Sequence, residues 1–350
     1  MSDTAHPLLP AGTPLLRSDA VDLQVGGVDT AEGLLVSPQP EGLAAVLRGL
    51  DGRRAQRAVV ADAARQGADA GAVAAVLEGL RAAGLLVDVD AVDLLATDAG
   101  PAATARHAVE TPPSGGWGAR RAAVVVVDGA TRVGTPLAAV LAASGVGRVS
   151  VRDAGLTAAG DVVVGGATAA DEGRPRSLAA ADAVRRANPL ADLRPPTGGT
   201  TPDLVVLARP WAASDPTAAG WFRAGVPHLV ATVRGSTGVV GPLVLPGVTS
   251  CLRCADLHRR DADPRWPQLA AQLTAAEPPP SGATVTCLLT AATAAVQVLA
   301  YLDGSAAPAA LDATLELVPP DLAPRVRRWT AHPECGCAQR EDRTTGDNGP

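Results

Sequence analysis

Four of the five cysteines form two tight pairs that lie far apart in the chain. Cys251 and Cys254 are spaced as C-x-x-C, and Cys335 and Cys337 are spaced as C-x-C. Four thiolates supplied as two pairs suit a tetrahedral metal ion, and zinc fits this ligand set best. We predict a structural zinc site that ties the end of the chain to the body of its domain. Redox-active dithiols and unliganded thiols are the alternatives.

Other side chains near the two pairs could take part in chemistry or in packing. His258 and His332 could each replace one thiolate, although four cysteines already fill a tetrahedral shell. Cys287 stands in an apolar run, which favours a small buried side chain over a catalytic thiol. Trp266 follows the first cysteine pair, and we expect it to pack over the cysteine module; contact with a partner peptide is the alternative.

A glycine-containing turn follows a run of apolar residues, Ala122 to Val127. Gly129 and Gly134 take the first and last positions of a dinucleotide-type turn, where one glycine allows the bend and the other allows close packing of helix on strand. Thr131, and not a glycine, stands at the middle position, so its Cβ narrows the space that a bound phosphate would occupy. Asp153 ends the next predicted strand, where an acid can bind ribose hydroxyls. The pattern fits either nucleotide binding or maintenance of the fold alone.

Further segments occur in the order and spacing of one family. They are GRPRSLAAADAVRRANP, GVVGPLVLPGVTSCLRC and the distant cysteine pair. From Ala119 to Cys337 the chain resembles the ThiF/MoeB/HesA superfamily, bacterial adenylyltransferases similar to ubiquitin-activating enzymes. The resemblance implies a Rossmann-like, doubly wound α/β domain of the ThiF type with a zinc site. It also implies ATP with magnesium as candidate cofactors.

Carried over residue by residue, the resemblance gives a nucleotide-binding set and leaves the catalytic residues unknown. The set is Gly129, Thr131, Arg132, Gly134, Asp153 and Arg176. Arg176 stands where the family has a lysine that contacts ATP, so the positive charge is kept but the compact ammonium is not. Arg132, Arg174 and Arg176 could bind a nucleotide or a peptide carboxylate, or could form a solvated face.

Other family elements are changed or missing. Thr131 and Arg132 replace two glycines of the family turn, and residues 160–169 lack the arginine that the family brings to the ATP phosphates. The sequence ARPW, at 208–211, stands where the family has an Asp-Asn pair that helps to hold magnesium. Because losses of this kind remove electrostatic stabilisation worth several kcal/mol, we expect a catalytically degenerate protein. An active ATP-dependent adenylyltransferase acting on a C-terminal carboxylate of a protein or peptide is the alternative.

The first 97 residues form a separate small domain in this prediction. The stretch 23–36 is typical of a strand hairpin, and helical spacing follows over 41–51 and 57–67. Asp69 can cap a third helix that runs to Gly84, after which LLVDV returns to strand. This order predicts a winged-helix-like α+β domain; a helical adaptor is the alternative.

The remaining boundaries follow from composition. Residues 98–118 have linker composition, 119–338 form the ThiF/MoeB-like domain with its four-cysteine zinc site, and 339–350 form a polar tail that we expect to be disordered.

This architecture is similar to that of partner proteins of azole-forming cyclodehydratases, in which the small domain binds the leader of a precursor peptide as an added strand. The resemblance implies a zinc-stabilised scaffold that binds a peptide or small protein and a partner modifying enzyme. The hairpin at 23–36 and the helix at 41–51 would form the groove. Relatives are commonly symmetric dimers, so a homodimer is a further expectation.

Composition argues against several other classes of protein. A net charge of −6 and the absence of lysine disfavour nucleic-acid binding, and a DNA-reading role for the helix at 69–84 would rest on Arg81 alone. The apolar stretch 283–302 carries several threonines and a glutamine, which favours a buried core helix over a membrane span. No secretory signal is visible, so we expect a cytoplasmic protein without a membrane partner. The cysteine pairs argue against a nicotinamide-dependent oxidoreductase.

Overall fold

The computed structural model describes most of the chain as two compact units, Met1–Ala119 and Arg120–Pro350. The described residues are 5–10, 12–17, 21–27, 33–89, 117–197, 199–209, 216–275, 281–304 and 306–337. The predicted linker, 98–118, lies outside them up to residue 116, and the predicted tail, 339–350, lies outside them entirely.

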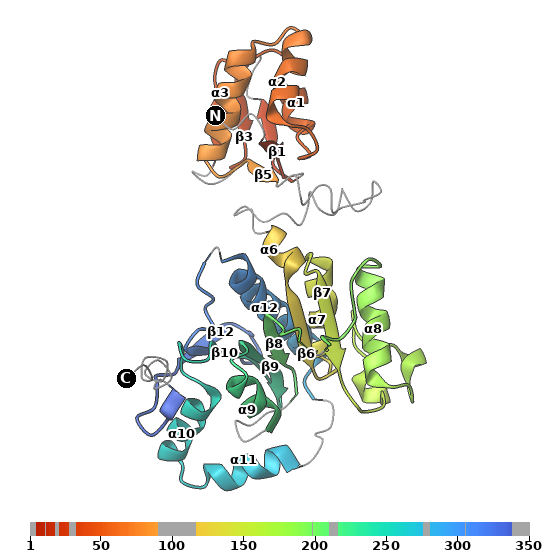
Figure 1. The fold of residues 1–350 in the computed structure, drawn as a ribbon, viewed down its shortest axis with the longest axis vertical. Helices are drawn as coiled ribbons and strands as arrows, with labels where there is room; N and C mark the ends of the chain where they lie inside the picture. Colours follow the sequence, from red (N-terminus) through yellow and green to blue (C-terminus); the bar gives the residue numbers. More distant parts are fainter. Residues whose placement is uncertain are drawn as a thin grey trace, which may run out of the picture. The chain divides into compact units, whose positions relative to one another are not determined.

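The N-terminal unit combines short strands with helices (Figure 1). Its antiparallel sheet has the order β2-β3-β4, and a second strand pair joins β1 to β5. Its elements are β1 (His6–Leu8), β2 (Leu15–Arg17), β3 (Leu23–Val25), β4 (Leu34–Val36), α1 (Leu43–Arg48), α2 (Gln56–Arg65), α3 (Ala70–Ala82) and β5 (Val87–Val89). The hairpin predicted at 23–36 is confirmed, because β3 and β4 pair with Leu23 opposite Val36.

Helix α3 illustrates how local sequence sets this unit. The Asp69 carboxylate accepts the backbone N–H groups of Gly71 and Ala72 at 2.7 and 3.0 Å, so it caps the helix as predicted. Leu77 and Leu80 are fully buried among apolar side chains of the strands and the other helices. The unit is therefore a small α+β domain with its own core.

The C-terminal unit is built on a sheet of seven strands with the order β12-β11-β10-β9-β8-β6-β7. Its strands are β6 (Val124–Asp128), β7 (Arg148–Arg152), β8 (Leu204–Leu207), β9 (His228–Arg234), β10 (Thr237–Val244), β11 (Ala313–Leu317) and β12 (Pro324–Arg328). Strands β7, β6, β8 and β9 are parallel, and β10, β11 and β12 are antiparallel to their neighbours. The sheet is thus mixed, with an antiparallel half that the alternating strand and helix pattern did not predict.

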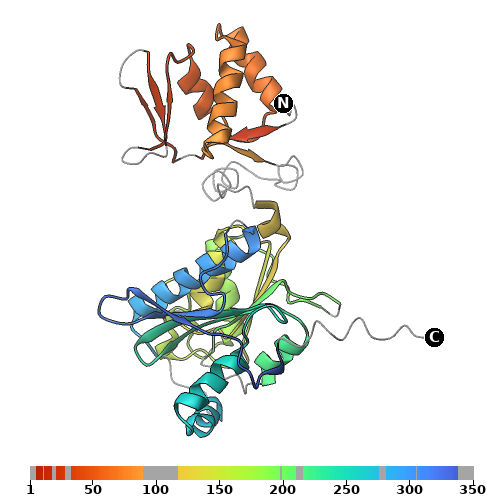
Figure 2. The same cartoon turned by 90° about the vertical axis from the view of Figure 1, so that its left-hand side faces the viewer.

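Helices cover both faces of this sheet (Figure 2). The helices of this unit are α6 (Trp117–Ala122), α7 (Gly134–Ala143), α8 (Arg176–Ala187), α9 (Pro216–Arg223), α10 (Leu252–Ala262), α11 (Trp266–Ala275) and α12 (Thr284–Asp303). Val125 and Val127 pack with α7 and α12, whereas Val126 packs with α9 and the cysteine pairs on the opposite face. This alternation is what a strand buried on both faces requires, and it gives the Rossmann-like, doubly wound arrangement that was predicted.

Helix α12 is long and apolar enough to cross a bilayer, by length and composition. In the structure Cys287, Ala294 and Val298 are fully buried in the core formed with the sheet and α7. Its last residue, Asp303, forms an ion pair with Arg120 through two contacts of 2.6 Å, and both side chains are almost completely buried. The helix therefore occupies the core position that was expected for it.

Candidate functional site

The carboxyl ends of the parallel strands enclose a pocket. Strands β7 and β8 flank β6 on opposite sides, so the order of the chain reverses between β6 and β8, and open α/β sheets bind ligands at such a point. A pocket of about 520 Å³ lies there. Its lining includes Asp128, Arg152, Asp153, Ser177, Arg209 and Thr217.

The turn after β6 needs both of its predicted glycines. Gly129 has φ +115°, and an added Cβ would lie 2.7 Å from Cγ of Arg209. At Gly134 an added Cβ would lie 2.0 Å from the carbonyl oxygen of Gly129 and 2.8 Å from Cβ of Ala208. The tight bend and the close packing of α7 against the sheet therefore both depend on glycine.

The side chain of Thr131 accepts hydrogen bonds from backbone N–H groups at the start of α7. Its hydroxyl donates to the carbonyl oxygen of Ala208 at 3.0 Å and accepts the N–H groups of Gly134 at 3.0 Å and Val133 at 3.3 Å. Free N–H groups at a helix N-terminus are what bind phosphate in nucleotide folds. Here a protein hydroxyl already satisfies two of them.

Asp153 lies against the turn, as the predicted ribose ligand would. Its carboxylate accepts the N–H of Ala130 at 2.9 Å and the N–H of Gly155 at 2.8 Å. Arg176 lies beside it, with Nη1 3.8 Å from the Asp153 carboxylate and Nε 3.0 Å from Asp161. The acid therefore holds the turn in place, and Arg176 faces two carboxylates.

The two other arginines considered from the sequence contact groups other than the pocket lining. Arg132 donates to the carbonyl oxygen of Gly282 at 2.6 Å and to the hydroxyl of Thr284 at 2.8 Å, and so ties the turn to the start of α12. Arg174 is partly exposed and pairs with Asp171 and Asp182. Of the predicted set, all but Arg132 gather around the turn and the pocket, whereas Arg132 contacts the start of α12. The five that gather there are Gly129, Thr131, Gly134, Asp153 and Arg176.

Three charged residues that line the pocket were not singled out from the sequence. Nε of Arg209 lies 3.2 Å from the carboxylate of Asp128, and the guanidinium of Arg152 lies 5.6 Å from the centre of the Trp221 ring. Asp128 ends β6 and Arg209 follows the neighbouring parallel strand β8. The carboxyl ends of these strands meet at one edge of the sheet, and that position was the available signal. Arg209 belongs to the ARPW stretch. The last two residues of that stretch, 210 and 211, lie outside the described residues.

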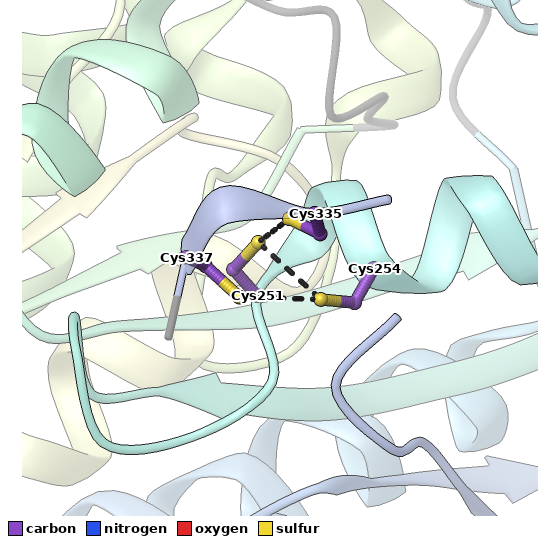
Figure 3. A group of neighbouring side chains, drawn as sticks. All are labelled: Cys251, Cys254, Cys335 and Cys337. Atoms are coloured by element: carbon purple, nitrogen blue, oxygen red, sulfur yellow. Dashed lines mark hydrogen bonds between the residues drawn. The ribbon is translucent and has the colours of Figure 1, made fainter. Parts of the chain in front are cut away.

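The four paired cysteines converge into one buried cluster (Figure 3). Their sulfur atoms all lie within 4.8 Å of one another, and the closest pairs are Cys254 with Cys337 at 3.3 Å and Cys251 with Cys335 at 3.5 Å. A tetrahedral ion with Zn–S bonds of about 2.3 Å needs sulfur atoms about 3.8 Å apart, whereas a disulfide needs about 2.05 Å. The spacing therefore fits four thiolates around one zinc ion, and the described cysteines form no disulfide.

The nearby histidines support the cluster from outside it. The backbone N–H of His332 donates to Sγ of Cys254 at 3.3 Å, while its ring contacts Asp261 through Nε2 at 2.8 Å and the N–H of Glu334 through Nδ1 at 3.1 Å. Nε2 of His258 lies 3.0 Å from a backbone carbonyl oxygen. Neither imidazole replaces a cysteine in this arrangement.

Burial controls how these thiols ionise when no metal is bound. It raises the pKa of Cys251 well above its ordinary value and raises the pKa of Cys337 to about 12. Burial also acts to raise the pKa of Cys254, but the hydrogen bond from the His332 N–H and those with neighbouring cysteines lower it overall. Because thiolates are the ligands of zinc, filling the site must release protons.

The remaining predictions about single side chains concern packing. Cys287 is fully buried in the core, as expected of a small apolar side chain, and burial raises the pKa of its thiol. Trp266 packs against Ala270, and the guanidinium of Arg259 lies 5.2 Å from the centre of its ring.

Comparison with known proteins agrees with this geometry. Residues 118–337 match the ThiF family. No curated protein matches the chain. Among solved structures, Escherichia coli MccB in complex with ATP superposes with a TM-score of 0.61 at 14% identity, covering 95% of this chain and 99% of that chain. The same enzyme with a MccA variant, MccA-N7isoASN, gives 0.60 at 14% identity over the same shares of the two chains.

A third similar structure is PaaA, with a TM-score of 0.55 and 17% identity over 73% of this chain and 91% of that chain. At these identities the structural matches show a shared fold, and the match to the family covers most of the chain. The strand-end pocket, the glycine turn and the four-cysteine cluster all lie within the matched residues. The chain belongs to the ThiF family.

Proposed function

We propose that this protein binds a peptide through its N-terminal unit and acts as a zinc-stabilised scaffold for a peptide-modifying, azole-forming partner enzyme. In this proposal the ThiF domain has lost adenylation activity. The observation that carries the proposal is the edge of strand β4, beside helix α3, that has no strand partner among the described residues.

Strand β4 offers a place for an added strand. It lies at one end of the order β2-β3-β4, so in the described residues one side of its backbone has no strand partner. Helix α3 packs close to it, since an added Cβ at Gly79 would lie 3.5 Å from Cδ2 of Leu34. An extended peptide that pairs with an open sheet edge gains affinity from backbone hydrogen bonds and selectivity from the side chains around it.

The solvent face of the same sheet carries two exposed leucines. The register places Leu16, Gln24 and Leu35 side by side across the sheet. Leu16 is 45% exposed and Leu35 is 56% exposed. A peptide paired with β4 would bring its alternate side chains next to Leu35, which supports an apolar residue at that position of the ligand.

The comparisons support a peptide ligand. MccB is described as a microcin C7 biosynthetic enzyme in a complex with N-formylated MccA, and the MccB match covers 95% of this chain. Transfer of peptide binding from MccB to this chain is part of the proposal.

The strand-end pocket supports loss of adenylation. An adenylating site must neutralise phosphate charge. Here the Thr131 hydroxyl accepts hydrogen bonds from two backbone N–H groups at the start of α7, which a phosphate would otherwise use. Arg209 pairs with Asp128, which leaves that carboxylate less suited to hold magnesium. Each lost group of this kind costs roughly 3 to 4 kcal/mol of transition-state stabilisation in enzymes where it has been measured.

One observation favours the alternative, an active ATP-dependent adenylyltransferase that activates a C-terminal carboxylate. The pocket has a volume of about 520 Å³, and Asp153, Arg152 and Arg209 are among the residues that line it. In that case the arginines would contact the phosphates that magnesium otherwise neutralises.

A peptide-display selection on the full-length, zinc-loaded protein tests the proposal. Peptides enriched by the protein should slow hydrogen exchange of the β4 amides, and Leu35→Asp should lower their enrichment at least tenfold. Val326→Asp, which changes a similarly exposed apolar residue on β12, is the matched control. The proposal fails if enriched peptides protect other segments, or if both variants behave alike.

A further inference from the structure

A second cavity adjoins the cysteine cluster. It has a volume of about 400 Å³, and it lies between helix α9 and the residues that carry the cysteine pairs. Cys251, Cys335 and Cys337 line one part of it, and Ala219 and Phe222 of α9 line another. It shares Ala218 and Leu252 with the strand-end pocket, but the turn residues and charged groups of that pocket are not part of its wall.

A buried histidine borders this cavity. His228 begins strand β9, is 1% exposed, and has Nδ1 2.9 Å from the carbonyl oxygen of Val226. A carbonyl can only accept, so Nδ1 carries the proton and Nε2 is the hydrogen-bond acceptor of the neutral ring. Burial lowers the pKa of His228, which agrees with the neutral form.

Nε2 of His228 has no hydrogen-bond partner among the described residues. This nitrogen is not fully enclosed by neighbouring atoms, and His228 is one of the residues that line the cavity. Buried acceptors are normally satisfied, because leaving one unpaired is costly. A group that donates a hydrogen bond from within the cavity would satisfy this nitrogen.

Charge is distributed unevenly along the cavity. Arg223 and Arg253 line it and are exposed residues, whereas His228 and the cysteines are buried. With zinc bound, the thiolate sulfurs are acceptors as well. The buried end therefore offers acceptors, the exposed end offers cationic donors, and no carboxylate is among the described lining residues.

We infer that this cavity binds a carboxylate that carries an N–H group close by, the chemistry shared by a peptide C-terminus and a free amino acid. The carboxylate pairs with Arg253, the N–H donates to Nε2 of His228, and the apolar part of the ligand packs on Phe222. A volume of this size lies in the range of small-ligand sites. The inference does not depend on the proposed function, because it concerns neither β4 nor the strand-end pocket.

Titration with small probes tests the inference on the zinc-loaded, full-length protein labelled with ¹⁵N-histidine. The probes are glycylalanine, glycylalanine amide and free alanine, and the readout is the Nε2 resonance of His228, assigned with His228→Gln. At least one of the two carboxylate probes should shift this resonance saturably, and the amide should bind at least tenfold more weakly. If only the dipeptide binds, the natural ligand is a peptide C-terminus; if only alanine binds, it is a free amino acid; binding of both supports the shared chemistry.

Charge variants supply the matched comparison. Arg253→Gln should weaken binding at least tenfold, whereas Arg265→Gln, which alters a highly exposed arginine paired with Asp263, should leave it unchanged. Both positions are exposed, so neither change threatens the fold. The inference is overturned if no probe shifts the His228 resonance, if the amide binds as well as the acid, or if the two arginine variants bind alike.

Discussion

Replacing one cysteine of the cluster should remove the metal and weaken the whole C-terminal unit. Cys254 is fully buried, and its sulfur lies 3.3 Å from that of Cys337 and 3.9 Å from that of Cys251. Cys254→Ser replaces a thiolate by a hydroxyl, which is a poor zinc ligand. We expect bound zinc to fall from one equivalent towards none.

The loss of stability can be estimated from the loop that the ion closes. Cys251 and Cys335 are 84 positions apart, so zinc links two segments of the chain across that distance. The chain-entropy relation for a cross-link over such a loop gives roughly 4.5 kcal/mol. For a unit of this size, a change of that magnitude lowers Tm by about 9 to 18 °C.

Zinc content by mass spectrometry and Tm by calorimetry are the two measurements. Cys287→Ser is the matched control, because Cys287 is equally buried but lies outside the cluster. The control should retain one equivalent of zinc. A Cys254→Ser protein that keeps its zinc, or a wild type that binds none and melts at the same temperature as the variant, would refute the reasoning.

Three further changes test the packing of the same unit. Asp303→Asn removes the charge that faces the buried guanidinium of Arg120, so the free energy of unfolding in urea should fall by about 3 to 5 kcal/mol. Gly134→Ala places a methyl group 2.0 Å from the carbonyl oxygen of Gly129, and the forced shift of the turn should cost about 1 to 3 kcal/mol in the same assay. Hydrogen bonds from the side chain and backbone of Thr168, with the neighbouring arginine, lower the pKa of Asp171, so its stabilising effect is present above about pH 4 and is lost as the pH falls. Asp171→Asn should therefore show a shallower loss of Tm on acidification than the wild type.

Each of these changes has a control in the same unit. Arg194→Gln breaks an exposed ion pair and should cost less than about 1 kcal/mol. Gly220→Ala adds a methyl group with nothing within 4 Å and should be neutral or slightly stabilising. Asp321→Asn alters an exposed carboxylate and is the matched variant for the Tm profile of Asp171→Asn. The packing arguments fail wherever a variant and its control give the same result.

Features that depend on local sequence could be predicted without the structure. The carboxylate of Asp69 caps its helix because the N–H groups it accepts are two and three residues away. The cysteine cluster was predictable for a similar reason, since its ligand types and paired spacing already suit a tetrahedral ion. The positions of Gly129 and Gly134 follow from the strand-turn-helix pattern. The structure shows which atoms a Cβ at each position would clash with.

Features that depend on which segments meet in space could not be predicted in this way. The direction of Arg132 is set by the start of α12, about 150 residues further on in the chain. The pair of Asp128 with Arg209 exists because β8 lies beside β6, and the environment of His228 is formed by α9 and by both cysteine segments. In each case the side chain is ordinary in sequence, and its partner is fixed by the topology of the sheet.

The central claim, a peptide-binding member of the ThiF family that does not adenylate, is tested most directly by ATP–pyrophosphate exchange. The assay uses the zinc-loaded protein with and without a peptide that protects β4, and Asp153→Ala serves as the control. The account predicts no exchange above background in any sample, while the peptide still binds. Exchange in the wild type that disappears in Asp153→Ala would contradict it and would identify an active adenylyltransferase.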